Sequence, residues 1–370
     1  MPVPKNPAVM EKFKGEQQLP VQLRVLNVLK SWTEKYFLDF AYDKQLAQIL
    51  FEFANTNTSR HSAALKQIVK KLKQKLSAYR SGEYTKKPTI QPPTGQTPPV
   101  HPIQRKGAKI ASIYDFHAEE IARQMCLYDF ALFSQIQPLE LMNKVYETER
   151  RKAINYLRFT RRTQTLRNWA IQQLVHQQGA GKDRKLILTI LIDIASYSYD
   201  LRNFHAVKSL LSGLQSSEVQ SLTQTWESLD SATSKKYEKL LAAEKSSFSS
   251  LKVFQSKYAG DSVEDPGIPI IELFVKEIVN IEEKDNNFID NNLINASKSR
   301  QLNATFSDLN RFRNVPYNFE QQPWIQNYIQ VDLEKFAPRT TDNLEETSIS
   351  NIGSFFTSFT FFILTLNFSF

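Results

Sequence analysis

The central part of the chain places apolar residues at helical spacing. Residues 186–196 (LILTILIDIAS) are apolar nearly all round, as expected of a helix in the middle of a large core. In residues 204–214 the apolar side chains recur every three or four positions, which predicts a second, amphipathic helix. Ser217 is followed three residues later by Gln220, a spacing typical of a capping box, so we expect a third helix to begin there.

Beyond Trp226 the pattern changes to two narrow apolar stripes. Residues 233–245 and 248–258 each carry one stripe at helical spacing, and Ser246-Ser247 separates them. The stripe residues are Tyr237, Leu240 and Leu241 in the first segment and Phe248, Leu251, Phe254 and Tyr258 in the second. Two such helices joined by a short polar break predict an antiparallel helical hairpin. Because stripes that pair with each other leave little surface to anchor on a core, we expect the hairpin to protrude.

The N-terminal part of the chain is also helical in pattern. Residues 21–40 place their apolar side chains on one face, and residues 46–53 and 61–76 continue as helices. The first of these stripes consists of Val25, Leu26, Leu29, Trp32, Tyr36 and Phe37. For Trp32 we expect packing in a core.

A proline-rich stretch separates the two helical regions. Six prolines lie between Arg80 and Lys109, a density that excludes a helix and predicts a semi-extended linker. The segment PPTGQTPPVHP has the composition of a ligand for an SH3-type groove, but a spacer is the favoured interpretation. With 370 residues, 41% hydrophobic content and only 10 glycines, the chain has the material for a sizeable core, two domains and an all-α fold.

Charge and cysteine content narrow the function classes. The net charge of +9 suggests acidic partners, but the basic residues are scattered through helices without an arginine-rich tract. A solvated basic surface is therefore favoured over nucleic-acid binding. The single cysteine, Cys126, excludes a disulfide framework and a cysteine-based metal site, and it fits a reducing compartment.

The sequence contains no motif for covalent or cofactor chemistry. It has no GxxxxGK[ST], no HExxH, no nucleophile elbow and no glycine-rich kinase loop. The five histidines, which are too far apart in the sequence to suggest a metal cluster, are His61, His101, His117, His176 and His205. We expect no cofactor, no metal and no covalent catalysis. We expect His117 to cap a helix and His205 to lie at the edge of a core.

The segment LRNFHAVKSLLSGLQSSEVQSLTQTWESL (residues 201–229) and the hairpin pattern after it resemble the centre of the catalytic domain of Ras-type guanine nucleotide exchange factors. The spacing from Trp226 to Phe248 matches that family without a gap. RVLNVLKSWTEKYFLDF (residues 24–40) resembles the start of the family's N-terminal Ras-exchanger-motif domain, and EEIARQM (residues 119–125) resembles a conserved block of the catalytic domain. The resemblance covers roughly residues 20 to 335.

The chain departs from the family pattern at several positions. Glu272 stands where the family has glycine, Lys276 where threonine is usual and Ala296 where an aromatic residue is normal. Trp169 is kept, but the asparagine that the family has nearby is absent. These departures support an alternative, an exchange-inactive small-GTPase-binding or scaffold protein of the same fold.

The resemblance implies a factor that accelerates GDP release from a Ras-family small GTPase without covalent chemistry. In the family the hairpin, here residues 234–258, wedges near the nucleotide site. The residues so implied for the wedge and the GTPase contact are Lys236, Tyr237, Lys239, Leu240, Trp226 and Arg123, and those for structural support are Asn203, Phe204, Trp32 and Trp169. For Arg123 an intradomain salt bridge is an equal alternative.

The predicted organisation has four parts: an N-terminal Ras-exchanger-motif helical domain (1–82), the linker (83–108), the catalytic exchange domain (109–340) and a phenylalanine-rich tail (341–370). The end of the tail is uncharged and long enough to span a bilayer. Its Phe, Thr and Ser residues suit strands better and no basic cluster flanks it, so an atypical or non-native tail is favoured over an anchor. Since the chain opens without a secretory signal, we expect a cytoplasmic protein recruited to membranes through the GTPase or the tail.

Overall fold

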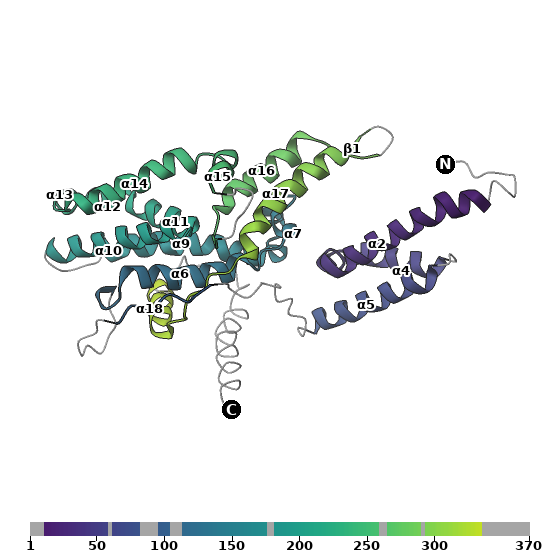
Figure 1. The fold of residues 1–370 in the computed structure, drawn as a ribbon, viewed down its shortest axis with the longest axis horizontal. Coiled ribbons are helices and arrows are strands. Elements are labelled where there is room, and N and C mark those ends of the chain that lie inside the picture. Colours follow the sequence, from purple (N-terminus) through teal and green to yellow (C-terminus); the bar gives the residue numbers. More distant parts are fainter. Residues whose placement is uncertain are drawn as a thin grey trace, which may run out of the picture. The chain divides into compact units, whose positions relative to one another are not determined.

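The computed structural model describes residues 11–57, 61–81, 95–103, 113–175, 181–258, 265–289 and 293–334. The predictions about the tail, about His176 and about parts of the linker lie outside the described residues. The chain separates into two compact units, residues 1–88 and 89–370, and each is described by itself (Figure 1).

The N-terminal unit packs amphipathic helices around a small core. Its elements are the π-helical turn η1 (Lys14–Gln18), α2 (Leu19–Lys35), α3 (Phe37–Tyr42), α4 (Lys44–Thr56) and α5 (Ser62–Arg80). The buried side chains of this core are Phe37, Phe40, Ala47, Leu50, Ala54, Leu65, Val69, Leu72 and Leu76. Trp32 packs against this core while remaining half-exposed, which supports the packing role predicted for it.

The second unit is built almost entirely from helices. Its elements in order are η2 (Ile113–Asp115), α6 (Ala118–Phe133), α7 (Pro138–Leu141), α8 (Val145–Thr148), η3 (Arg150–Lys152), α9 (Ile154–Val175), α10 (Gly181–Asp200), α11 (Phe204–Leu214), α12 (Ser217–Gln220), α13 (Thr223–Glu227), α14 (Ser231–Ser247), α15 (Leu251–Tyr258), α16 (Ile271–Lys284), β1 (Phe288–Ile289), β2 (Leu293–Ile294), α17 (Ala296–Asn314) and α18 (Pro323–Glu334). The prediction of an all-α fold is confirmed; β1 and β2 form one short antiparallel pair between α16 and α17.

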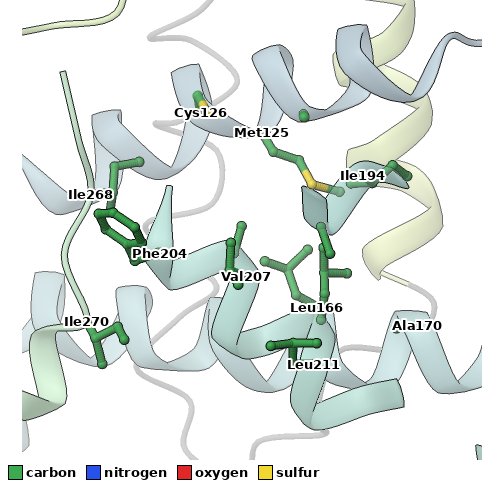
Figure 2. Packing of buried hydrophobic residues seen from close by; sticks show 14 of the residues in the cluster. Met125, Cys126, Leu166, Ala170, Ile194, Phe204, Val207, Leu211, Ile268 and Ile270 are labelled. Atoms are coloured by element: carbon green, nitrogen blue, oxygen red, sulfur yellow. The ribbon is translucent and has the colours of Figure 1, made fainter. Parts of the chain in front are cut away.

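Helix α11 packs against α9, α10 and α14, and Figure 1 shows it beneath α14. Apolar side chains of α6, α9 and α10 pack against those of α11. Figure 2 shows this packing for Met125, Leu166 and Val207. Gly213 permits the close approach of α11 to α9, because a Cβ at this position would lie 2.7 Å from the backbone oxygen of Arg167. Any side chain here would push the two helices apart.

Polar side chains define several helix starts. The Oδ1 atom of Asp230 accepts the amide hydrogens of Ala232 and Thr233 at the start of α14, and His117 Nδ1 accepts that of Glu119 at the start of α6, as predicted. The predicted capping box at α12 is wrong. The N-cap residue of α12 is Ser216, and the Gln220 side chain donates instead to the backbone oxygen of Leu214, because that carbonyl at the end of α11 needs a partner.

The hairpin break also falls later than predicted. The hydroxyl of Ser246 donates to the backbone oxygen of Ala242, so α14 continues through Ser247 and the chain turns at residues 248–250. Within the part of the chain that the structure describes, no helix is both long enough and apolar enough to cross a bilayer.

Candidate functional site

The segment joining α10 to α11 is fixed by a buried polar network. Asn203 Oδ1 accepts the amide hydrogen of Ala206 and so caps α11, while its Nδ2 donates to Asp129 Oδ2 over 2.9 Å. The second oxygen of Asp129 accepts from Arg162 Nε, also over 2.9 Å. All three side chains are buried, so the carboxylate charge of α6 is compensated inside the core.

The same segment is tied to the strand-like stretch before α16. The Phe204 amide donates to the backbone oxygen of Ile268, and the Ile268 amide donates to that of Arg202. Arg202 adopts a left-handed conformation at φ 60°, which turns the chain out of α10. Leu201 contributes its backbone oxygen to the hydroxyl of Tyr317 over 2.8 Å. These bonds leave the position of Phe204 with little freedom.

Phe204 anchors the second helix of the hairpin. Its ring lies 5.7 Å from that of Phe248, 5.3 Å from that of Phe254 and 4.3 Å from that of Tyr258, measured between centroids. Tyr258 also exchanges a hydroxyl hydrogen bond of 2.8 Å with Tyr199 on α10. The aromatic cluster formed by Phe204, Phe248, Phe254 and Tyr258 therefore joins α15 to the centre of the unit. Asn203 and Phe204, which the resemblance assigns to structural support, are both buried here.

The hairpin stripes point into the core, contrary to the expectation that they pair mainly with each other. Leu240 is 1% exposed and Phe254 is fully buried, and both belong to the main hydrophobic cluster. Helix α14 packs on α10 and α11 and forms an outer layer of the unit (Figure 1). The reason is α10, which is apolar nearly all round and offers α14 a surface that the narrow stripe can cover. Leu240 therefore lies on the inner face of α14, among the core residues of the unit.

Trp226 and Tyr237 pack against each other at the start of the hairpin. Their ring centroids are 4.8 Å apart, and Trp226 Nε1 donates to the backbone oxygen of Val219 over 3.0 Å. Burial raises the pKa of the Tyr237 hydroxyl, although a bond from Gln220 counteracts this. Both rings are half-buried, and their contacts join α12, α13 and α14.

Two lysines of α14 pair with acids of α10. Lys236 forms an ion pair with Asp193, which raises the pKa of the Lys236 amine. Lys239 Nζ lies 3.8 Å from Asp200 and above the ring of Tyr199. Both lysines are exposed, so their pairs are weak and a partner can replace them.

The outward face of α14 carries exposed residues besides the predicted Lys236 and Lys239. Exposed positions recur at helical spacing on the side opposite the buried residues Leu240 and Ala243. We call this set the outer stripe; it consists of Lys235, Glu238, Ala242 and Lys245, with Lys239 beside it. Helical periodicity in the sequence indicates the outer stripe, because its residues lie on the face of the helix opposite the apolar stripe.

Arg123 lies inside the unit, in the intradomain salt bridge that was the alternative for it. Its guanidinium contacts Glu119 Oε1 at 2.6 Å, Glu120 Oε2 at 3.3 Å and the backbone oxygen of Pro99 at 2.9 Å. The side chain is 10% exposed. These bonds place the described part of the linker, residues 95–103, against α6.

Two further tryptophans, Trp169 and Trp32, donate hydrogen bonds to carboxylates within their own units. Trp169 is fully buried on α9 and donates to Asp332 Oδ2 of α18 over 2.7 Å. In the N-terminal unit, Trp32 donates to Asp39 Oδ2 over 2.6 Å.

The positions that depart from the family pattern cause no crowding in the core. Glu272 is half-buried and lies 3.8 Å from Lys208, while Lys276 and Ala296 are exposed. None of the three belongs to the buried core. His205, predicted at the edge of the core, is buried against Phe159, and burial lowers its pKa so that it is neutral at neutral pH.

Comparison with known proteins identifies this helical unit. Residues 120–300 match the family model described as the RasGEF domain. The chain is 27% identical over 340 residues to Ras guanine nucleotide exchange factor A of Dictyostelium discoideum, covering 88% of this chain and 53% of that protein. It is 28% identical over 323 residues to Ras guanine nucleotide exchange factor J of the same organism (86% and 38%). It is 24% identical over 325 residues to the Drosophila melanogaster protein son of sevenless (86% and 20%).

The chain therefore contains a RasGEF catalytic domain over residues 120–300 and is homologous to Ras guanine nucleotide exchange factors over most of its length. It spans about half the length, or less, of these relatives. A domain of this family is an exchange factor rather than an enzyme of covalent chemistry, and it implies binding of a Ras-family GTPase.

Proposed function

We propose that this chain accelerates GDP release from a Ras-family small GTPase, with the outer stripe of α14 as the contact surface. The observation that carries the proposal is the position of α14, whose inner face is fixed on α10 while its outer stripe is exposed. The RasGEF match supports the partner class. Trp226 and Tyr237 hold the start of the helix, and the aromatic cluster anchors its end.

Exchange by this route needs differential binding and no covalent step. A protein that binds the nucleotide-free GTPase more tightly than the loaded form shifts the equilibrium toward release, by about tenfold for each 1.4 kcal/mol of difference. A rigid helix suits this task, because little binding free energy is lost in ordering it. The buried networks at Asn203 and Phe204 supply that rigidity. Lys236 and Lys239 can exchange their acidic partners on α10 for acidic groups of the GTPase.

The test is release of fluorescent GDP from a panel of Ras-family GTPases. We expect acceleration by the full chain, and loss of at least about tenfold in the double variant Lys235→Glu/Glu238→Lys, which rearranges the charges of the outer stripe at constant net charge. Because both positions are exposed, circular dichroism and the melting temperature should remain those of the wild type.

The control variant is Arg300→Glu, because Arg300 is exposed on α17. Lys298 on the same helix is not substituted, because it is buried. Its exchange activity should equal that of the wild type. If the outer-stripe variant also retained full activity, the contact surface would lie elsewhere on the domain.

The alternative is a GTPase-binding or scaffold protein without exchange activity. Its main support is the set of residues that depart from the family pattern. Of these, Lys276 is exposed, and Glu272 is half-buried beside Lys208. Affinity measurements separate the two functions. Equal affinity for GDP-loaded and nucleotide-free GTPase across the panel would favour the scaffold, because a ligand indifferent to two states shifts neither.

A further inference from the structure

Two histidines that are distant in the sequence meet where the linker contacts α6. His101 belongs to the segment 95–103, and His117 is the N-cap residue of α6. Their rings stack with centroids 4.1 Å apart and an angle of 14° between the planes. His101 Nε2 also lies 3.1 Å from Glu119 Oε2. The sequence-based statement that the histidines are too far apart for a metal cluster is wrong for this pair.

The three side chains offer the donor set of a metal site. One ligand atom each from His101, His117 and Glu119 lie within 4.8 Å of one another. Two imidazoles and one carboxylate are a common protein ligand set for Zn²⁺, which prefers tetrahedral coordination with bonds of about 2.0–2.2 Å. Such coordination places neighbouring ligand atoms about 3.4 Å apart. The cluster has to contract by little more than an ångström, and His101 can supply this movement because it is half-exposed on a segment without regular secondary structure.

The surroundings orient the carboxylate ligand. Arg123 binds Glu119 through Oε1, which leaves Oε2 directed at His101. Glu120, which is buried, accepts the backbone amide hydrogen of His101 over 3.3 Å and fixes the linker at this point. Hydrogen-bonded outer partners of this kind are typical of metal sites, where they hold the ligands in place. The two glutamates and Arg123 together carry one net negative charge, which favours a dication.

We propose that His101, His117 and Glu119 form a Zn²⁺ site that fixes the linker to the first helix of the RasGEF domain, with water as the remaining ligand. The site is separate from the outer stripe of α14. Its role is structural, because metal binding links two segments that are otherwise joined by hydrogen bonds and a ring stack. The proposal does not depend on exchange activity.

The test is calorimetric titration of the full chain with ZnCl₂ after treatment with EDTA. We expect one Zn²⁺ per chain and an affinity reduced by more than about tenfold in His101→Ala, since changes to outer-shell residues alone cost 10–100-fold. His117→Asn should have the same effect while preserving the helix cap, because asparagine is a good N-cap residue. The control is His61→Ala, a histidine of the N-terminal unit, which should bind Zn²⁺ like the wild type.

Co²⁺ provides a readout that is independent of affinity. Bound at this site it should show the intense visible absorption of tetrahedral coordination, and His101→Ala should abolish it. The proposal is overturned if the wild type binds no Zn²⁺ at concentrations up to ~100 µM, an affinity weaker than about −5.5 kcal/mol. It is equally overturned if His101→Ala and His117→Asn bind Zn²⁺ as tightly as the wild type.

Discussion

The rings of Phe204 and Tyr258 lie 4.3 Å apart between centroids, and this contact joins the first residue of α11 to the last residue of α15. Phe204 is held in turn by backbone bonds to Ile268. A residue at the centre of the unit thus determines where the hairpin ends. The proposed exchange activity depends on the position of α14. That position is determined by the packing of α14 on α10 and α11.

Replacing Phe204 with alanine should loosen the hairpin before it affects other helices. Truncation of a fully buried phenylalanine costs about 3–5 kcal/mol. We expect hydrogen exchange to accelerate most in residues 248–258, which contact this ring, and urea denaturation to shift to lower concentration. Phe204→Leu should retain most of the stability. Uniform acceleration over the whole unit would contradict a local anchoring role.

Leu240→Ala should destabilise the catalytic unit by about 2–4 kcal/mol, because the side chain is buried against α10 and α11. Ala242→Ser, two residues along on the outer stripe, should change the free energy of unfolding by less than about 0.5 kcal/mol. Urea denaturation of both variants measures the contrast. Comparable, small effects would mean that the inner face of α14 is not packed as described.

Asn203→Ala removes a helix cap and one partner of a buried carboxylate at once. Loss of the cap costs about 0.5–2 kcal/mol, and leaving Asp129 short of a hydrogen bond adds about 1–3 kcal/mol. Asn203→Asp keeps the cap but sets two carboxylates against each other, so we expect it to be at least as harmful at neutral pH and to improve in acid. A pH series of denaturation curves distinguishes the two variants; an Asp variant as stable as the wild type at pH 7 would count against the network.

Trp32→Phe should cost the N-terminal unit about 1 kcal/mol at neutral pH, since the lost bond to Asp39 is only half-buried. Burial raises the pKa of Asp39 above 3.8, and the bond from Trp32 lowers it. A raised folded-state pKa means that the contribution of Asp39 to stability is greatest below 3.8 and declines as the pH rises through the folded value. Removing the bond raises that pKa further, so the cost should shrink as the pH falls toward 4. A cost independent of pH would contradict the assigned bond.

Cys126 should resist alkylation in the native protein. It is the only cysteine of the chain, it is fully buried on α6, and burial raises its pKa so that little thiolate is present. Labelling by iodoacetamide should therefore report opening of the catalytic unit, and Phe204→Ala should accelerate it. Rapid labelling of the wild type at neutral pH would show that α6 is less securely packed than the described contacts require.

The sequence predicted the helices and the buried anchors well, because helical spacing and the family resemblance both depend on local patterns. Phe204 and Trp169 occur among apolar residues at helical spacing, and this spacing predicts that their side chains are buried. The direction of the hairpin stripe was missed because Leu240 has a partner on α10, some 50 positions earlier in the chain, and periodicity says nothing about such a partner. The contact of Arg123 with Pro99 and the meeting of His101 with His117 were missed for the same reason: both depend on where the linker lies.

Residues 95–103 have no regular secondary structure, yet their bonds to α6 and to Asn318 make them part of the catalytic fold. The catalytic domain therefore begins before its first helix, and it includes residues 95–103. A truncated chain beginning at residue 105 would keep every helix of the domain and still leave Arg123, Glu120 and Asn318 without partners that the intact chain provides. A truncated variant that retains these bonds should therefore begin before Gly95.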